Sequence, residues 1–368
     1  ALGKQGSREL NYSSDIDPIL LFDPETLPCR PREDVQEAAV RIGRRVVELL
    51  QARDGDGYVL RVDLRLRPSP EVTPIALPVE AAISYYESQA LPWERAAFIR
   101  ARACAGDRAL GAYFLDAIRP FVWRRALDYG TIREIRDISR RIRDHYSQAQ
   151  AFGPGYDLKR GRGGIREVEF FAQIHQLIHG GREPSLRAPA TRDALAALAE
   201  AGRIGLDEAQ DLTRAYVALR TIEHRLQMVD DRQTHQLPEN PDSLDNVARL
   251  HGLADGAALT DLLRPHVIRV GAVYDSLAGE EEQRLPSESA PLEAKLGAAG
   301  FERPDGAARI VQGWRAGTYP ALRTPAAREA LESVLPGLID AFSRAPDTVH
   351  AITRFDAMLS RLPSAINF

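Results

Sequence analysis

The chain has 368 residues, a formal net charge of −4 and 44% hydrophobic residues. This length is sufficient for two or three domains with a substantial hydrophobic core. The near-neutral charge argues against general nucleic-acid binding, which depends on a strongly cationic surface. No apolar run in the sequence approaches the length of a membrane-spanning helix, so we expect no membrane association.

Cysteine and lysine are both scarce. The two cysteines, Cys29 and Cys104, are too few to cross-link a chain of this size, so we expect a reducing, cytoplasmic setting. No signal peptide precedes the first motif and the chain lacks an initiator methionine, from which we expect a fragment of a longer protein. Nearly all basic residues are arginine, and clustered arginine is suited to local recognition of phosphate.

The first distinctive segment is GKQGSRELNYSSDID, residues 3–17, which we predict to form a loop, a short helix or turn, and a strand. Side chains alternate in an extended strand, so Asp15 and Asp17 project from one face. The glycines allow a close backbone approach to a phosphate and the serines can donate to its oxygens, although a plain tight turn is the alternative. The candidate phosphate- or nucleotide-binding residues here are Gly6, Ser7, Arg8, Ser13 and Ser14.

A helix over residues 33–52 and a turn over 54–57 lead to a second predicted strand, GYVLRVDLRLRP, residues 57–68. One face of this strand carries Arg61, Asp63, Arg65 and Arg67. Asp63 is a metal ligand or an ion-pair partner, and the arginines bind phosphate or form a solvated face. Three carboxylates brought together would repel, and one or two Mg²⁺ ions would relieve that repulsion. The candidate metal ligands are Asp15, Asp17 and Asp63.

Residues 81–107 are predicted to be helical, with an interruption before Pro92. Arg95 and Arg102 lie two helical turns apart in this segment and can share a face. Guanidinium groups make bidentate contacts with phosphate, so both are candidate phosphate ligands. Structural ion pairs with Glu87 or Glu94 are the competing interpretation.

The rest of the chain is predicted to be helical. The glycine-rich segment GPGYDLKRGRGG, residues 153–164, leads into a helix over 165–179, and its basic residues with the helix amides could bind an anion. Such glycine-rich entries also occur without ligands. Glu167, a further candidate phosphate- or nucleotide-binding residue, falls on the apolar side of that helix. It therefore requires a cationic or metal partner, and we expect an arginine from the preceding part of the chain. Glu169 is expected to be a second contact or exposed.

The glycine-serine loop followed by Asp-x-Asp resembles the DNA-polymerase-β-like nucleotidyltransferases. More narrowly, the motifs GKQGSRELNYSSDID, VDLRLRP, WERAAFIRAR, GRGGIREVEFFAQ and GGREPSLR, in this order, resemble the bifunctional glutamine synthetase adenylyltransferase family. The resemblance implies an α+β fold, with a small mixed-sheet nucleotidyltransferase core at residues 1–128. It also implies a helical domain at 129–279 that packs on the active site and a helical bundle at 280–368 toward a second catalytic half.

The two halves of that family catalyse opposed reactions on glutamine synthetase. The amino-terminal half removes AMP by phosphorolysis, giving ADP, and the carboxy-terminal half adds AMP from ATP. The motifs GGIREVEF and GGREPSLR and the end of the chain, MLSRLPSAINF, resemble the amino-terminal half. The resemblance therefore implies a deadenylylating enzyme of nitrogen metabolism that uses Mg²⁺, with adenylylated glutamine synthetase, the PII signalling protein, phosphate and ADP as partners.

Within this interpretation, Asp15, Asp17 and Asp63 would hold the metal, and Arg65, Arg67, Arg95 or Arg102 would hold the attacking phosphate. Two alternatives remain open at this point. The same fold could run in the forward direction as an adenylyltransferase. The chain could also be a docking module for glutamine synthetase or PII protein with little activity of its own.

Overall fold

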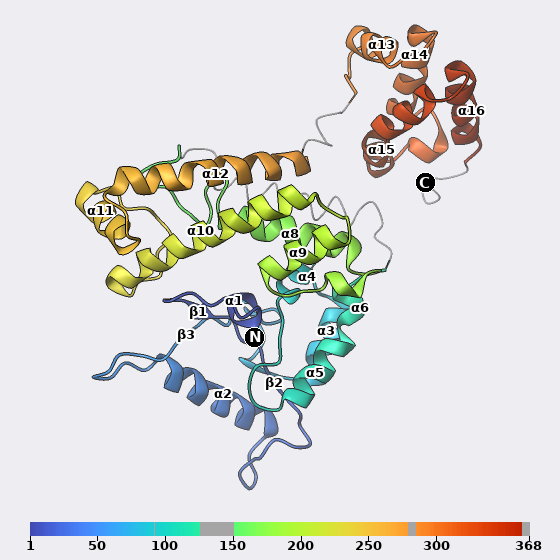
Figure 1. Ribbon diagram of the computed structural model, residues 1–368. Helices are drawn as coiled ribbons and strands as arrows, with labels where there is room; N and C mark the ends of the chain where they lie inside the picture. The colour runs from blue at the N-terminus through green and yellow to red at the C-terminus, as the bar shows by residue number, and fades with distance from the viewer. Residues whose placement is uncertain (92, 126–150, 279–284, 363–368) are drawn as a thin grey trace. The chain divides into compact units, whose positions relative to one another are not determined.

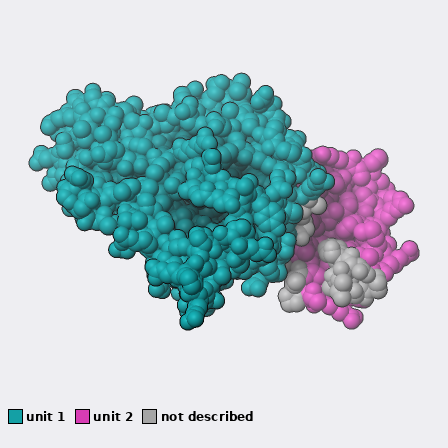
Figure 2. All heavy atoms as spheres, turned by 90° about the horizontal axis from the view of Figure 1, so that it is seen from below, with its two compact units in different colours: residues 1–277 teal, residues 278–368 magenta. Residues whose placement is uncertain are grey.

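The computed structural model describes residues 1–91, 93–125, 151–278 and 285–362 (Figure 1). The chain divides into two compact units, Ala1–Leu277 and Ala278–Phe368, which are coloured separately in Figure 2. Both predicted domain boundaries, after residues 128 and 279, lie outside the described residues. The predicted α+β class is confirmed, since short strands occur near the amino terminus and helices follow (Figure 1).

The amino-terminal part of the first unit contains two short parallel ladders. Strand β1 (Asp15–Ile16) pairs with β3 (Arg61–Val62), and β2 (Leu20–Phe22) pairs with β4 (Ala76–Pro78). The strand predicted over residues 57–68 is therefore too long. It ends at Val62 because Asp63 Oδ1 accepts a hydrogen bond from Arg65 N, a turn contact that competes with strand pairing.

Helices surround these strands: α1 (Gly3–Gly6), α2 (Val35–Gln51), α3 (Val79–Ser88), α4 (Glu94–Phe98), α5 (Arg108–Ala117) and α6 (Arg119–Val122). Their core is centred on Tyr86, whose ring lies 4.7 Å from the ring of Phe98 and 5.9 Å from that of Phe114. The predicted interruption before Pro92 is confirmed, but the helix predicted to continue to residue 107 ends at Phe98. Beyond it, Arg102 N donates to Ala1 O, so this segment pairs with the amino-terminal residues instead.

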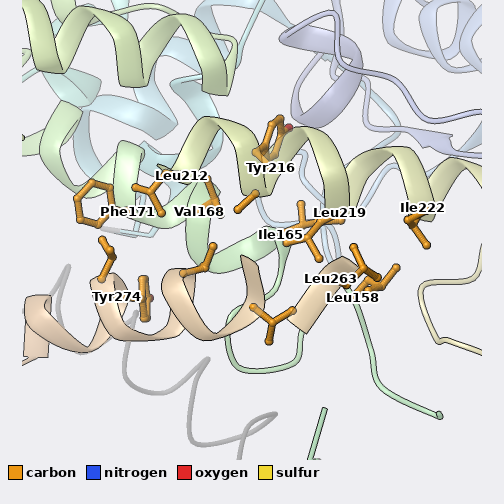
Figure 3. Packing of buried hydrophobic residues seen from close by; sticks show 14 of the residues in the cluster. Leu158, Ile165, Val168, Phe171, Leu212, Tyr216, Leu219, Ile222, Leu263 and Tyr274 are labelled. Atoms are coloured by element: carbon orange, nitrogen blue, oxygen red, sulfur yellow. The ribbon is translucent and has the colours of Figure 1, made fainter. Parts of the chain in front are cut away.

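The remainder of the first unit is helical: α8 (Ile165–His179), η1 (Pro184–Leu186), α9 (Thr191–Glu200), α10 (Leu206–Asp230), α11 (Pro241–Leu250) and α12 (Gly256–Ala278). The helix predicted over 165–179 is confirmed. Apolar side chains of α8 and α10 pack with α12 into one core, and Figure 3 shows Ile165, Leu219 and Leu263 among them. This helical part also carries polar side chains that reach the strands.

The second unit contains α13 (Ser289–Ala298), α14 (Pro304–Arg315), η2 (Pro320–Leu322), α15 (Pro325–Ser343) and α16 (Thr348–Arg361). Its core surrounds the fully buried Trp314, whose Nε1 donates a hydrogen bond of 2.7 Å to Asp356 Oδ1. Across the described part of the chain, no helix combines the length and the apolar character needed to cross a membrane.

Candidate active site

The segment predicted to begin the site folds as a tight helical turn against β1. Leu2 N donates to Asp17 O at 2.9 Å, and Gly6 N donates back to Leu2 O at 2.9 Å. Gly3 has a positive φ of +54°, and a Cβ atom at this position would lie 2.3 Å from Asp17 Oδ2. Glycine at position 3 therefore adopts the left-handed conformation readily and lets the Asp17 carboxylate lie directly against the turn.

The strand pairing brings the three aspartates into one region. Asp15 lies opposite Arg61 in the ladder, and Asp63 N donates to Ile16 O at 2.8 Å. Burial, together with the negative charges of Asp15 and Asp63, raises the pKa of Asp17 to about 6. The carboxylates are thus close enough to repel one another through the protein.

Two of these carboxylates are engaged by neighbouring side chains. Both oxygens of Asp63 accept hydrogen bonds from Arg65 Nε, at 3.0 and 2.8 Å, and Asp15 Oδ1 accepts one of 2.7 Å from Gln233 Nε2. In this arrangement no three His, Cys, Asp or Glu side chains of the described residues are grouped as metal ligands. The chemistry nevertheless fits Mg²⁺, because the donors are hard oxygens and Asp17 is a partly buried carboxylate repelled by Asp15 and Asp63.

Gly6 and Ser7 contact protein atoms in this arrangement. A Cβ atom on Gly6 would lie 1.8 Å from Arg100 O, so this glycine allows two backbone segments to approach each other. Ser7 is buried, and its Oγ donates to Gly3 O and Lys4 O, each at 3.3 Å. These contacts hold the turn together, and the predicted phosphate contacts of the two residues stay a prediction.

The other predicted residues of this segment lie in different surroundings. Ser13 is buried, its N donates to Gln227 Oε1 at 3.0 Å and its Oγ donates to Asp231 O at 3.2 Å. Ser14 Oγ donates to Asp15 O at 3.0 Å, and Arg8 is exposed with a φ of +61°. Ser13 thus joins the strand region to α10, while Ser14 stays beside the aspartates.

Three of the four predicted phosphate-binding arginines are used within the fold. Arg67 donates to the carbonyl oxygens of residues 64 and 70, at 2.9 and 2.7 Å, and Arg102 donates to those of residues 6 and 5, at 3.1 and 3.0 Å. Arg95 is buried with its guanidinium 5.2 Å from the centre of the Phe121 ring. The shared helical face predicted for Arg95 and Arg102 is wrong, because α4 ends between them. Arg65 is paired with Asp63, and its side chain is 85% exposed.

An arginine from the preceding part of the chain pairs with Glu169 of α8, which was expected to be a second contact or exposed. Glu169 Oε1 lies 3.2 Å from Arg100 Nη1, and both side chains are buried. Burial alone would raise the pKa of Glu169, but the charge of Arg100 together with those of nearby basic residues outweighs it, and the pKa lies below its ordinary value. Glu167 Oε2 accepts a hydrogen bond of 2.9 Å from Gly163 N at the start of α8.

A buried cluster of charges was not found by sequence reasoning. Glu223 of α10 is fully buried, with Oε2 3.2 Å from both Lys4 Nζ and Arg220 Nη1, and Oε1 2.7 Å from His235 Nδ1. Burial lowers the pKa of Lys4 to about 8, and Glu223 opposes this effect. The available signal was the position of Glu223, which falls one helical turn after Leu219 on the apolar side of its helix.

The sequence of the chain is similar to that of known proteins. Residues 1–117 match the family model for glutamate-ammonia ligase adenylyltransferase, and residues 135–278 match the model for GlnD PII-uridylyltransferase. Relatives from Caulobacter vibrioides and Agrobacterium fabrum, each named bifunctional glutamine synthetase adenylyltransferase/adenylyl-removing enzyme, are 45% and 44% identical over 100% and 99% of this chain.

The chain spans 38% of the length of each of these relatives. The similarity extends along the whole chain and includes the segments that form the aspartate site, so over these residues the chain is similar to the bifunctional glutamine synthetase adenylyltransferase/adenylyl-removing enzymes.

Proposed function

We propose that this chain removes AMP from adenylylated glutamine synthetase by phosphorolysis. An oxygen of inorganic phosphate attacks the adenylyl phosphorus, the bond to the tyrosine oxygen breaks, and ADP and unmodified tyrosine are formed. The observation that carries this proposal is the approach of Asp15 and Asp63 to Asp17 beside Gly3. The names of the relatives give both an adenylyltransferase and an adenylyl-removing activity, and the direction is proposed from the resemblance of GGIREVEF and GGREPSLR to the amino-terminal half.

The reaction does not require a strong general base. Inorganic phosphate is already an anionic nucleophile, so the site must overcome charge repulsion and align the attack opposite the tyrosine oxygen. Asp15, Asp17 and Asp63 would hold Mg²⁺, which when bound neutralises the adenylyl phosphate and supports the phenolate leaving group.

The side chains of the chain provide alignment and charge. Asp17 is held in place by the turn at Gly3, and Asp15 by the hydrogen bond from Gln233. Arg65 is highly exposed, so its guanidinium can move from Asp63 to an anionic substrate. The leaving tyrosine oxygen takes its proton from solvent.

The test uses the whole chain with adenylylated glutamine synthetase, Mg²⁺ and inorganic phosphate. We expect ADP to form in proportion to the deadenylylated enzyme, and Asp15→Asn or Asp17→Asn to abolish its formation. Formation of AMP would indicate hydrolysis. Transfer of label from ATP to unmodified glutamine synthetase without ADP formation from the modified enzyme would indicate an adenylyltransferase and contradict the proposal.

A second candidate function is supported by the match of residues 135–278 to the GlnD PII-uridylyltransferase model. In this proposal the helical part binds PII protein or glutamine synthetase, and the chain has little activity by itself. Tight binding of either protein without ADP formation from adenylylated glutamine synthetase would favour this function over deadenylylation.

A further inference from the structure

A short two-stranded segment of the helical part reaches the aspartate site. Leu158 N donates to His235 O at 2.8 Å and Leu237 N donates to Tyr156 O at 2.9 Å, so residues 156–158 lie antiparallel to residues 235–237. We call these two segments the ribbon. The residues just before its second segment include Gln233, which bonds Asp15. The ribbon is therefore anchored beside the catalytic carboxylates.

Lys159 directly follows the first segment of the ribbon. Its backbone is fixed on both sides, because Lys159 N donates to Asp157 Oδ1 at 2.9 Å and Lys159 O accepts from Arg166 N at 3.0 Å. The residue is half-buried. Among basic groups, Lys159 exerts the largest attractive effect on the Asp17 carboxylate, ahead of Arg65. The ammonium group therefore lies within electrostatic range of Asp17, on a backbone that is fixed beside the ribbon.

The surroundings of Lys159 differ from those of the other basic residues near the site. Lys4 is paired with buried Glu223, and Arg102 donates to backbone carbonyls. Arg65 is paired with Asp63. Within the described ranges, the Lys159 ammonium has no carboxylate within ion-pair distance, so its three donors are available to a ligand.

We propose that Lys159 binds the inorganic phosphate that reacts at the aspartate site, so that the helical part supplies the cation for the nucleophile. This inference rests on the proposed phosphorolysis and deepens it. An ammonium group is a compact charge that offsets the repulsion between a phosphate and an adenylyl phosphate without requiring the planar geometry of a guanidinium. Lys159 takes the role that sequence reasoning gave to Arg67, Arg95 or Arg102.

The kinetic test compares Lys159→Gln and Lys159→Arg with the wild-type chain, and uses Lys295→Gln in α13 as the matched control. ADP formation from adenylylated glutamine synthetase is measured against phosphate concentration. We expect Lys159→Gln to raise the KM for phosphate at least tenfold, with a smaller change in kcat and in the KM for the protein substrate. Lys159→Arg should recover part of the loss, and Lys295→Gln should behave as wild type.

A second measurement on the wild-type chain does not depend on the folding of a variant. The chain contains lysine only at positions 4, 159 and 295, so acylation of each can be followed by peptide mass spectrometry. We expect inorganic phosphate to slow acylation of Lys159 severalfold and to leave Lys295 unaffected.

The proposal is overturned if an active wild-type chain shows no protection of Lys159 at saturating phosphate, or if folded Lys159→Gln keeps the wild-type KM for phosphate. A wild-type chain that forms no ADP but shows protected Lys159 would contradict the proposed reaction while retaining the phosphate site. The two failures are therefore distinguishable.

Discussion

Lys4 and Glu223 connect the turn that precedes β1 to helix α10, with Nζ 3.2 Å from Oε2. Arg220 and His235 contact the same carboxylate, which is fully buried. Burial would raise the pKa of Glu223, but the close contact with His235 Nδ1 and the charges of Lys4 and Arg220 outweigh it, so the pKa lies far below its ordinary value. One anion therefore holds three basic side chains from separate segments.

We expect Glu223→Gln to destabilise the first unit strongly. The substitution leaves Lys4 and Arg220 buried without their anion, and removal of one partner of a buried ion pair costs about 3–5 kcal/mol. Urea unfolding followed by circular dichroism measures the loss. Glu200→Gln, at the exposed end of α9, is the control and should change stability by less than about 0.5 kcal/mol. Equal unfolding midpoints for the two variants would show that the cluster contributes no net stability.

We expect Gln233→Ala to weaken the use of Mg²⁺ without a loss of stability. Gln233 is exposed, so its removal leaves no buried cavity, but its 2.7 Å hydrogen bond orients Asp15. Loss of a side chain that orients a metal ligand typically costs about 10-fold or more in metal affinity or activity. The measurement is the Mg²⁺ concentration that gives half the maximal rate of ADP formation.

Gln210→Ala is the matched control, because Gln210 is also exposed but lies near the start of α10. Its half-maximal Mg²⁺ concentration should equal that of the wild-type chain. The same value for Gln233→Ala would mean that the hydrogen bond does not orient Asp15 during the reaction.

The helix over residues 165–179 could be predicted because its signals are local. Gly164 precedes it, Gly180 follows it, and apolar side chains recur at helical spacing between them. The strand over residues 57–68 could not be bounded in the same way. Its alternation of apolar and charged residues continues past Val62, but the hydrogen bond from Arg65 N to Asp63 turns the chain there.

The aspartates of the candidate site could be found because alternation along a strand fixes the side of Asp15 and Asp17. The partners of the arginines could not be predicted, because a guanidinium reaches whichever acceptor the tertiary fold brings near. Arg102 bonds carbonyl oxygens of the turn at residues 5 and 6, and Arg100 bonds Glu169. Neither contact follows from the spacing of residues within a single segment.

We expect Gly3→Ala to lower kcat about 100-fold, because displacement of a catalytic group by about 1 Å can have an effect of this size. The added Cβ would lie 2.3 Å from Asp17 Oδ2, so the carboxylate must move. Gly202→Ala is the control, since Gly202 has a similar positive φ of +66° and no atom within 4 Å of the added Cβ. Both variants carry the backbone strain, and only Gly3→Ala disturbs Asp17. A similar kcat for both would contradict the positioning role of Gly3.

We expect Asp17→Asn to stabilise the metal-free chain, and to do so more at pH 7.5 than at pH 5. The pKa of Asp17 is about 6 in the folded chain, against an ordinary value of 3.8. Between these two values the folded chain binds more protons than the unfolded chain, so stability contributed by this group falls as the pH rises through this window. The full cost is present at pH 7.5, and the asparagine removes it. Thermal unfolding in the presence of a chelator measures the difference, with about 2–4 °C for each kcal/mol.

The same carboxylate repulsion should make Mg²⁺ stabilise the wild-type chain. A cation that binds the folded chain at Asp17 offsets the carboxylate repulsion and raises the Tm of the wild type at pH 7.5, and it should do so less at pH 5, where a proton occupies the site. Asp17→Asn should lose this response, whereas Asp56→Asn, at an exposed turn, should keep it. If Asp17→Asn instead lowered the Tm at pH 7.5 without metal, the attraction of Lys159 and Arg65 would exceed the combined effect of burial and the two neighbouring aspartates. The case for a cation at this site would then lose its electrostatic basis.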